Sequence, residues 1–178
     1  LQANLRRMGE LLGQPAHAAA VAEQYAARLQ QQQASVDKLN KLQSAPGVLL
    51  LLGHAGASPL AAGRESLGDW LIERAGGRNL ASHQGYKALS VEALVALDPE
   101  VLLVADRSVQ GEAALTALLQ QNPALASTRA VRDGRVLLVD PTLLVGGLGP
   151  RLPDQLAVLS AAFYPATPPA VAEVSSYP

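Results

Sequence analysis

The sequence of 178 residues contains no cysteine, so neither a disulfide, a thiolate metal site nor a cysteine nucleophile can belong to its fold or its function. The absence of cysteine does not fix the compartment. Hydrophobic residues make up 49% of the chain, which is enough to form the core of one domain without disulfides. An oxidising compartment such as the periplasm is therefore as compatible with this chain as the cytosol.

Excess charge of one sign and long apolar runs are also missing. Fourteen Lys and Arg residues oppose fifteen Asp and Glu residues, so the chain lacks the basic field that drives nonspecific nucleic-acid binding. The longest strongly apolar run, Val48 to Leu52, is about as long as a strand, whereas a membrane-spanning helix needs roughly 20 apolar residues.

The first 44 residues have helical periodicity, which Gly13 and Pro15 interrupt. They predict a short helix, a turn and a long helix, and the polar stretch from Gln30 to Gln33 predicts that the long helix is solvated and serves as a connection. The sequence begins at Leu1 inside this pattern, without an initiator Met or a signal peptide. We therefore expect a fragment that is preceded by further sequence.

The rest of the chain alternates predicted strands with predicted helices, as in an α/β fold with a mainly parallel, Rossmann-like sheet flanked by helices. Ser66 and Ser90 are the expected N-caps of the first two of these helices. The predicted strands are 47–53, 101–105 and 135–140, and the predicted helices are 67–75, 91–97, 112–121 and 152–163. The expected organisation is a connecting helical segment over 1–44, an α/β lobe over 45–165 and a proline-rich tail over 166–178.

Ligands of open α/β sheets bind outside the carboxyl ends of the strands, which directs attention to the loops there. The loops expected at that edge are 54–64, 106–111 and 141–151, with 82–89 as a further candidate. His54 directly follows the first strand and lies between Gly53 and Gly56. A neutral imidazole there can ligate iron or bind a polar ligand group, although a loop histidine without a role fits the sequence equally well.

Three further side chains are candidates for binding. Arg151 follows glycine and proline at the start of the last helix, where its planar guanidinium can bind a carboxylate, and the alternative is a solvated arginine. Tyr86, next to Gly85, either offers a flat apolar face to a ligand or plugs the end of the sheet. Glu92 lies in the first turn of its helix, where the helix dipole alone explains a carboxylate.

Catalytic motifs are missing from the sequence. There is no serine-nucleophile elbow or phosphate-binding loop, and the glycines of 145–149 lack the context of a dinucleotide fingerprint. A small α/β hydrolase stays open only through Asp106 and Asp140 at two strand ends, which have no partner in a recognisable motif. We therefore expect a protein that is not an enzyme.

The order of motifs along residues 47–165 resembles the C-terminal lobe of class III substrate-binding proteins of ABC importers, most of all their periplasmic haem-binding branch. The segments that carry this resemblance are 62–66, 69–79, 85–94, 97–104, 123–126 and 149–151. The helical residues 1–44 look like the end of a first lobe and the helix that joins the two lobes.

This resemblance implies a periplasmic protein of two α/β lobes that holds haem between them as a transported ligand, for iron acquisition. The first lobe, with the tyrosine that usually ligates the iron, has no counterpart here. His54 matches a loop that supplies a second axial iron ligand in some members, Arg151 matches a cleft-facing arginine and Tyr86 matches a wall of the cleft. Glu92 matches the glutamate that docks onto the dimeric permease.

The resemblance leaves the ligand open between haem and, in the same cleft, cobalamin or a ferric siderophore. The aromatic content of 3% favours haem, because the other ligands are expected to need more aromatic or basic loops. Without a partner lobe, apolar side chains on residues 1–44 are expected to be exposed, which can drive dimerisation.

Overall fold

Two helices open the chain, as the periodicity predicts. The computed structural model describes residues 2–53, 58–106, 112–144, 149 and 151–165. Helix α1 spans Gln2–Leu11 and α2 spans Pro15–Leu42. Gly13 takes the positive φ of 68° that the turn between them requires, and Pro15 begins α2, where its missing N–H costs no hydrogen bond. Among the described helices, none combines the length and apolarity needed to cross a bilayer.

A single sheet forms the centre of the lobe, with its strands in the order β4-β2-β1-β5-β6 and β3 paired with the start of β1. The strands are β1 Gly47–Gly53, β2 Leu60–Ala62, β3 Arg78–Asn79, β4 Tyr86–Ala88, β5 Val101–Asp106 and β6 Val136–Leu138. Strands β1, β3, β5 and β6 are parallel, while β2 is antiparallel to both β1 and β4. The predicted α/β class with a mainly parallel sheet is confirmed.

The sequence prediction missed the strands on one side of this sheet. Residues 60–62 and 86–88 were expected in loops, yet they form β2 and β4. Each has only three residues, and the run Leu60-Ala61-Ala62 contains no β-branched or aromatic residue, so local propensity gives no signal for it. Pairing with the end of β1, from Leu51 opposite Ala61 to Leu52 opposite Leu60, places it in the sheet.

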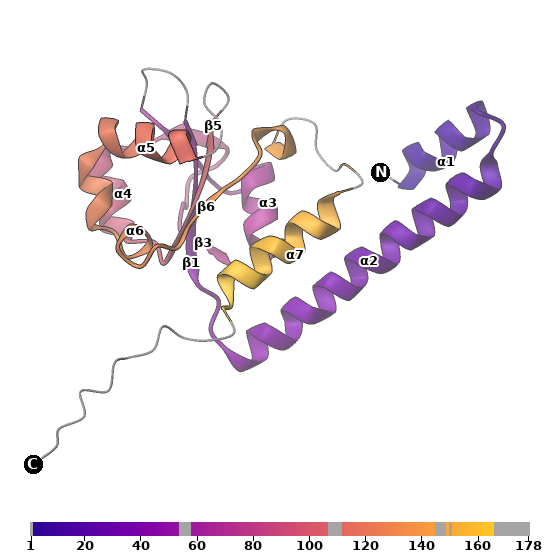
Figure 1. Ribbon diagram of the computed structural model, residues 1–178, viewed down its shortest axis with the longest axis horizontal. Coiled ribbons are helices and arrows are strands. Elements are labelled where there is room, and N and C mark those ends of the chain that lie inside the picture. The colour runs from indigo at the N-terminus through magenta and orange to yellow at the C-terminus, as the bar shows by residue number, and fades with distance from the viewer. Residues whose placement is uncertain (1, 54–57, 107–111, 145–148, 150, 166–178) are drawn as a thin grey trace, which may run out of the picture.

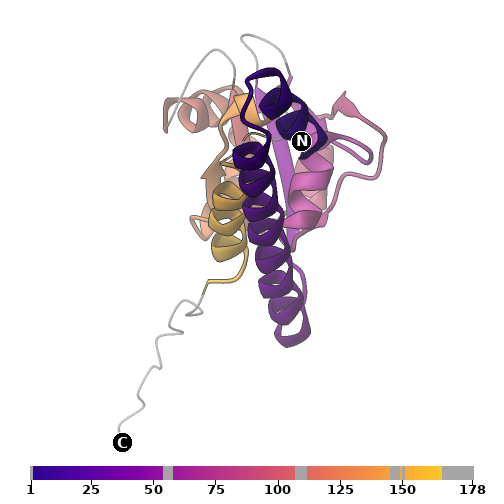
Figure 2. The same ribbon diagram turned by 90° about the vertical axis from the view of Figure 1, so that its right-hand side faces the viewer.

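Helices cover both faces of the sheet (Figures 1 and 2). They are α3 Leu67–Arg74, α4 Val91–Leu97, α5 Glu112–Gln121, α6 Arg129–Arg132 and α7 Leu152–Phe163, with short 3-10 turns at Pro123–Ser127 and Pro141–Leu144. Side chains of β1 alternate between the two resulting cores: Val48 and Leu50 pack with α3 and α7, and Leu49 and Leu51 pack with α4 and α5. Burial on both faces explains why β1 is a continuous apolar run.

Both predicted N-caps are confirmed. The Ser66 hydroxyl accepts the backbone N–H of Asp69 at 3.1 Å, and the Ser90 hydroxyl accepts that of Ala93 at 3.2 Å. A serine cap contributes about 1 kcal/mol by satisfying an N–H that the helix leaves without a partner. These caps fix where α3 and α4 start, and therefore where the loops at the carboxyl edge of the sheet end.

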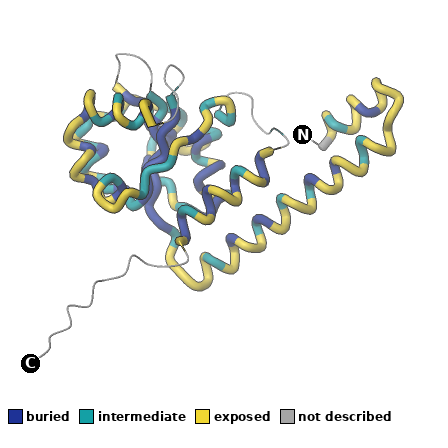
Figure 3. Tube along the Cα trace, viewed as in Figure 1, coloured by how far each residue is buried: buried dark blue, intermediate teal, exposed yellow. Residues whose placement is uncertain are grey.

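The glutamine stretch of α2 differs from its prediction. Gln30 and Gln31 are exposed, but Gln32 is only 8% exposed and faces α7 and the end of α3. Figure 3 shows buried positions recurring along α2 between exposed ones. The long helix therefore has one face packed on the lobe, which its hydrophilic composition conceals because a polar residue, Gln32, occupies a buried position of that face.

Candidate functional site

The carboxyl ends of β1, β5 and β6 lie at one edge of the sheet, since these strands are parallel. Gly53 and Asp106 end β1 and β5 and stand opposite each other in register. A Cβ atom on Gly53 would lie 2.6 Å from Asp106 Oδ2, so the Asp106 carboxyl group occupies the space that glycine leaves free. Any side chain larger than hydrogen at position 53 would displace that carboxyl group.

Asp140 follows β6 at the same edge and is held in a tight turn. Its Oδ1 accepts the Thr142 hydroxyl at 2.7 Å and the Thr142 backbone N–H at 2.9 Å. These hydrogen bonds hold the pKa of Asp140 below its usual range, and the positive charge of Arg151 lowers it further. The Asp140 carboxylate is thus committed to a structural turn.

Arg151 lies where the sequence predicts it, immediately before α7, and its side chain is exposed. The next residue, Leu152, belongs to the same core cluster as Val139 at the end of β6, and the charge of Arg151 contributes to the lowered pKa of Asp140. Pro153 fixes the first turn of α7 behind it. A guanidinium in this position can donate two parallel hydrogen bonds to a carboxylate ligand.

Tyr86 lies on β4, at the edge of the sheet opposite β6, and not in a loop as expected. It stands opposite Ala62 of β2, and its buried hydroxyl oxygen would be 3.4 Å from a Cβ atom on Gly68 of α3. The ring therefore packs between β2, β4 and the start of α3. Because the residue is half-buried, part of it stays accessible, and its role as a wall of a ligand cleft stays a prediction.

Glu92 is exposed in the first turn of α4. Strand β4 is antiparallel to β2 and therefore runs in the same direction as β1, so the start of α4 follows the carboxyl end of β4. Glu92 therefore lies at the same end of the sheet as Asp106 and Asp140, which is the end where the parallel strands finish. It is near β4, the edge strand that is farthest from β6.

The histidines differ in what the structure says of them. His54 lies outside the described residues, as do parts of the loops that follow β5 and precede Arg151. His17 is exposed on α2, and His83 is half-buried with its Nε2 atom 3.0 Å from Ala61 O. Within the described ranges, no group of three or more His, Asp or Glu residues is placed to hold a metal ion.

Two grooves are formed by other parts of the described structure. One, of about 410 Å³, runs between α2 and α7 and includes Gln32 and Asp154. The other, of about 510 Å³, lies beside the start of β6 and includes Arg135 and Ala162. Neither groove includes Tyr86 or Arg151, so these two candidates are not joined by either one.

Sequence reasoning missed two features of the carboxyl edge. The first is the contact between Gly53 and the Asp106 side chain, which depends on the register of two strands and has no local signature. The second is the turn made by Asp140 and Thr142. An Asp whose side chain accepts the N–H of the second residue after it is a known turn signal, so the order Asp140-Pro141-Thr142 contained that information.

Comparison with known proteins gives a consistent result. The family model described as "Periplasmic binding protein" matches residues 1–143. The solved structure of a periplasmic haem-binding protein from Pseudomonas aeruginosa is 58% identical, with a TM-score of 0.86, over 95% of this chain and 61% of that one. No curated protein matches the chain.

Two more distant structures agree with this likeness. The periplasmic haem-binding protein BhuT, in complex with two haems, is 32% identical over 92% of this chain and 61% of its own, with a TM-score of 0.74. The haem-binding protein HutB of Vibrio cholerae is 28% identical over 89% of this chain and 61% of its own, with a TM-score of 0.70. The chain thus spans about 61% of the length of each of these three proteins.

Proposed function

Because this chain belongs to the periplasmic binding protein family, we propose that it is the second lobe of a periplasmic protein that carries haem to an ABC importer. The observation that carries the proposal is the identity of 58% to a periplasmic haem-binding protein over 95% of the chain. Proteins of this family bind substrates, and the function proposed is capture and delivery without chemical change.

In this proposal, Arg151 is the main ligand-binding residue of the lobe. It is exposed at the carboxyl edge of the sheet, where ligands of such sheets bind. Haem carries two propionates, and a guanidinium can bind a carboxylate through two parallel hydrogen bonds. His54, in the loop after β1, is proposed as an axial ligand of the haem iron, and Tyr86 as a wall that contacts the macrocycle.

The first lobe is proposed to supply the remaining iron ligand. The chain covers 61% of the haem-binding relatives, and the proposed first lobe corresponds to length that these relatives have beyond the match. Segment 1–44 is proposed as the end of that lobe and the connecting helix. Its exposed apolar side chains, among them Met8, Leu11 and Leu12, would contact the first lobe or, without it, a second copy of the chain.

Glu92 is proposed as the contact of this lobe with the permease dimer. Its side chain is exposed, and it lies near β4, the edge strand of the sheet farthest from β6. Exposed charge pairs of this kind set orientation and association rate more than affinity.

The proposal is tested by adding hemin to the two-lobe protein and recording its absorption spectrum. A saturable Soret band at one haem or more per protein is expected, with no comparable spectral shift on adding cobalamin or a ferric hydroxamate siderophore. The 178-residue chain alone is expected to bind hemin more weakly, because it lacks the first lobe. Tight binding of cobalamin or the siderophore with no response to hemin would contradict haem as the ligand.

A further inference from the structure

Arg151 has no ionic partner, although a carboxylate lies one helical turn away from it. The Arg151 guanidinium is exposed, and it forms no ion pair or side-chain hydrogen bond with any other residue that the structure describes. Asp154 follows in the first turn of α7, and the Gln155 N–H donates to Arg151 O at 3.1 Å, so the turn between Arg151 and Asp154 is helical. Oppositely charged side chains three residues apart on a helix are neighbours and can form ion pairs.

Asp154 is bound instead by an arginine from a different helix. A guanidinium nitrogen of Arg28, on α2, lies 2.7 Å from Asp154 Oδ1. The two residues are 126 positions apart in sequence, so this ion pair depends on the packing of α2 against α7. The side chains of Arg28 and Asp154 are 56% and 60% exposed, and exposed ion pairs contribute little to stability. The pair therefore adds little to the stability of the fold, and its consequence lies in where it holds the Asp154 carboxylate.

Buried contacts between the same two helices fix Arg28 beside Asp154. Gln32 lies four residues after Arg28, on the same face of α2. It is 8% exposed, and its Nε2 atom donates to the hydroxyl oxygen of Ser160 on α7 at 3.2 Å, where Ser160 is 7% exposed. Both side chains also donate to carbonyl groups at the end of α3. Helices α2 and α7 are therefore held in the register that places Arg28 beside Asp154.

We propose that Arg28 is a positioning residue for the ligand site: by binding Asp154, it prevents that carboxylate from pairing with Arg151 and leaves the Arg151 guanidinium available to a carboxylate of the ligand. A guanidinium that already binds one carboxylate must release it before it can bind another through the same nitrogen atoms, so an Arg151–Asp154 pair would compete with a haem propionate. This inference rests on the proposed function, in which Arg151 binds a propionate and α2 is the connecting helix.

Substitutions of the two residues of this ion pair are expected to have different effects on hemin retention by the two-lobe protein. Arg28→Gln frees Asp154 to pair with Arg151, and hemin should dissociate about 2- to 5-fold faster, the range that exposed ion pairs give. Asp154→Asn removes the competing carboxylate, so dissociation should not become faster. The double variant Arg28→Gln/Asp154→Asn should match Asp154→Asn, because no competitor is left to be freed. Lys38→Gln, which removes an exposed positive charge from the same helix, is the control.

Three results would overturn the inference. Unchanged dissociation in Arg28→Gln would show that Asp154 does not compete for Arg151. An equal loss of retention in both single variants would show that the pair only supports the fold. A loss in the double variant as large as in Arg28→Gln would show that Arg28 acts through its own charge and not through Asp154. Failure of the unsubstituted two-lobe protein to bind hemin would contradict the proposed function itself, which the next measurement does not require.

Reaction of the 178-residue chain with phenylglyoxal, which modifies accessible guanidinium groups, tests the pairing without haem. Mass spectrometry of the peptides gives the rate at each arginine. The rate at Arg151 should fall at least about 2-fold in Arg28→Gln and return to the original value in the double variant, because an ion pair shields the guanidinium. Arg132, exposed on α6, is the internal control whose rate should stay constant. An unchanged rate at Arg151 in Arg28→Gln would overturn the inference, even if the two-lobe protein binds hemin tightly.

Discussion

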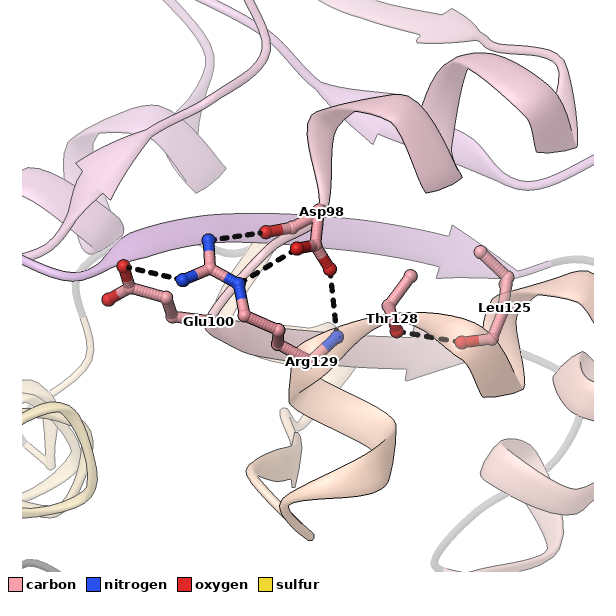
Figure 4. Close-up of polar contacts among 5 residues, drawn as sticks. All are labelled: Asp98, Glu100, Leu125, Thr128 and Arg129. Carbon is pink, nitrogen blue, oxygen red and sulfur yellow. Dashed lines mark hydrogen bonds and ion pairs between the residues drawn. The ribbon is translucent and has the colours of Figure 1, made fainter.

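Arg129 holds Asp98 through both its backbone and its side chain (Figure 4). Its backbone N–H donates to Asp98 Oδ1 at 2.9 Å, and its Nε atom donates to Asp98 Oδ2 at 2.8 Å. A guanidinium nitrogen also donates to the Asp98 carbonyl at 3.1 Å, and another reaches Glu100 Oε1 at 3.4 Å. Arg129 thereby joins the end of α4, the segment before β5 and the start of α6.

Asp98→Asn is expected to lower thermal stability at neutral pH. Asp98 ends α4 with a left-handed backbone, at a φ of 40°, which asparagine also tolerates. The substitution therefore removes the negative charge that faces Arg129 without adding backbone strain. Thermal unfolding followed by circular dichroism measures the effect, and the exposed Asp133→Asn is the control that should leave the midpoint unchanged.

The effect of Asp98→Asn should depend on pH in one direction. The hydrogen bonds and charge of Arg129 lower the pKa of Asp98 from its ordinary value of 3.8. A carboxylate with a lowered pKa in the folded state stabilises the fold above its ordinary pKa, and this contribution is lost as the pH falls through the lowered value. The two proteins should therefore differ at pH 7, and the difference should shrink as the pH falls below 3.8 through the lowered pKa of Asp98. A constant difference across this range would contradict the role of the charge.

Replacing either of two buried tyrosines with phenylalanine is expected to change the free energy of unfolding by different amounts. Tyr164 is 6% exposed and its hydroxyl contacts Gly76 O and Asn40, whereas Tyr25 is 7% exposed and its buried hydroxyl has no hydrogen-bond partner among the described residues. Tyr164→Phe should cost about 1–2 kcal/mol of unfolding free energy, because it leaves a buried carbonyl unpaired. Tyr25→Phe should be neutral or stabilise by up to about 1 kcal/mol.

Urea unfolding of the two variants measures this contrast, and each serves as the control for the other. Both substitutions remove a single oxygen atom from a buried ring, so differences in packing are small. Burial raises the pKa of both hydroxyl groups, so both tyrosines are neutral throughout the working pH range. An equal loss of stability in both variants would show that Tyr25 has a partner.

The elements that the sequence predicts well are those with a local cause. Residues adjacent in sequence determine three such features: the continuous apolar run of β1, the serine caps of α3 and α4, and the break at Gly13. Strands β2 and β4 have no such cause, because three residues beside an existing sheet are placed by pairing alone.

The candidate site is predictable only in part for the same reason. The positions of Arg151 and Glu92 could be predicted, because each lies at the start of a helix and the sequence indicates where those helices start. Tyr86 was expected in a loop because its strand is short, and its packing against Gly68 depends on how α3 lies on β2 and β4. The burial of Gln32 is likewise a tertiary effect, since its partners are 42 and 128 residues away in sequence.

Arg151→Ala in the two-lobe protein is expected to weaken hemin binding by on the order of 1–3 kcal/mol, the usual value of a hydrogen bond to a charged group. The reason is the loss of the proposed contact with a propionate. The measurement is the dissociation rate of hemin to an excess of a haem scavenger, with the exposed Arg132→Ala of α6 as the control. An unchanged rate would remove Arg151 from the proposed site.

Glu92→Arg is expected to separate transport from binding. The residue is exposed in the first turn of α4, so its replacement disturbs no buried contact, and the Ser90 cap that begins the helix stays in place. If Glu92 forms an exposed charge pair with a positive side chain of the permease, the introduced positive charge would repel that side chain, at a cost in association rate that falls with rising salt. Hemin affinity of the two-lobe protein should stay within about twofold of the wild type, whereas uptake into cells or permease-containing vesicles should fall at least roughly 10-fold.

Lys87→Glu, a charge reversal at an exposed position on β4, is the matched control and should leave uptake unchanged. Normal uptake by the Glu92 variant would return this carboxylate to the simpler role of a charge at a helix start, and a parallel loss of hemin affinity would show that the substitution acts on the site itself.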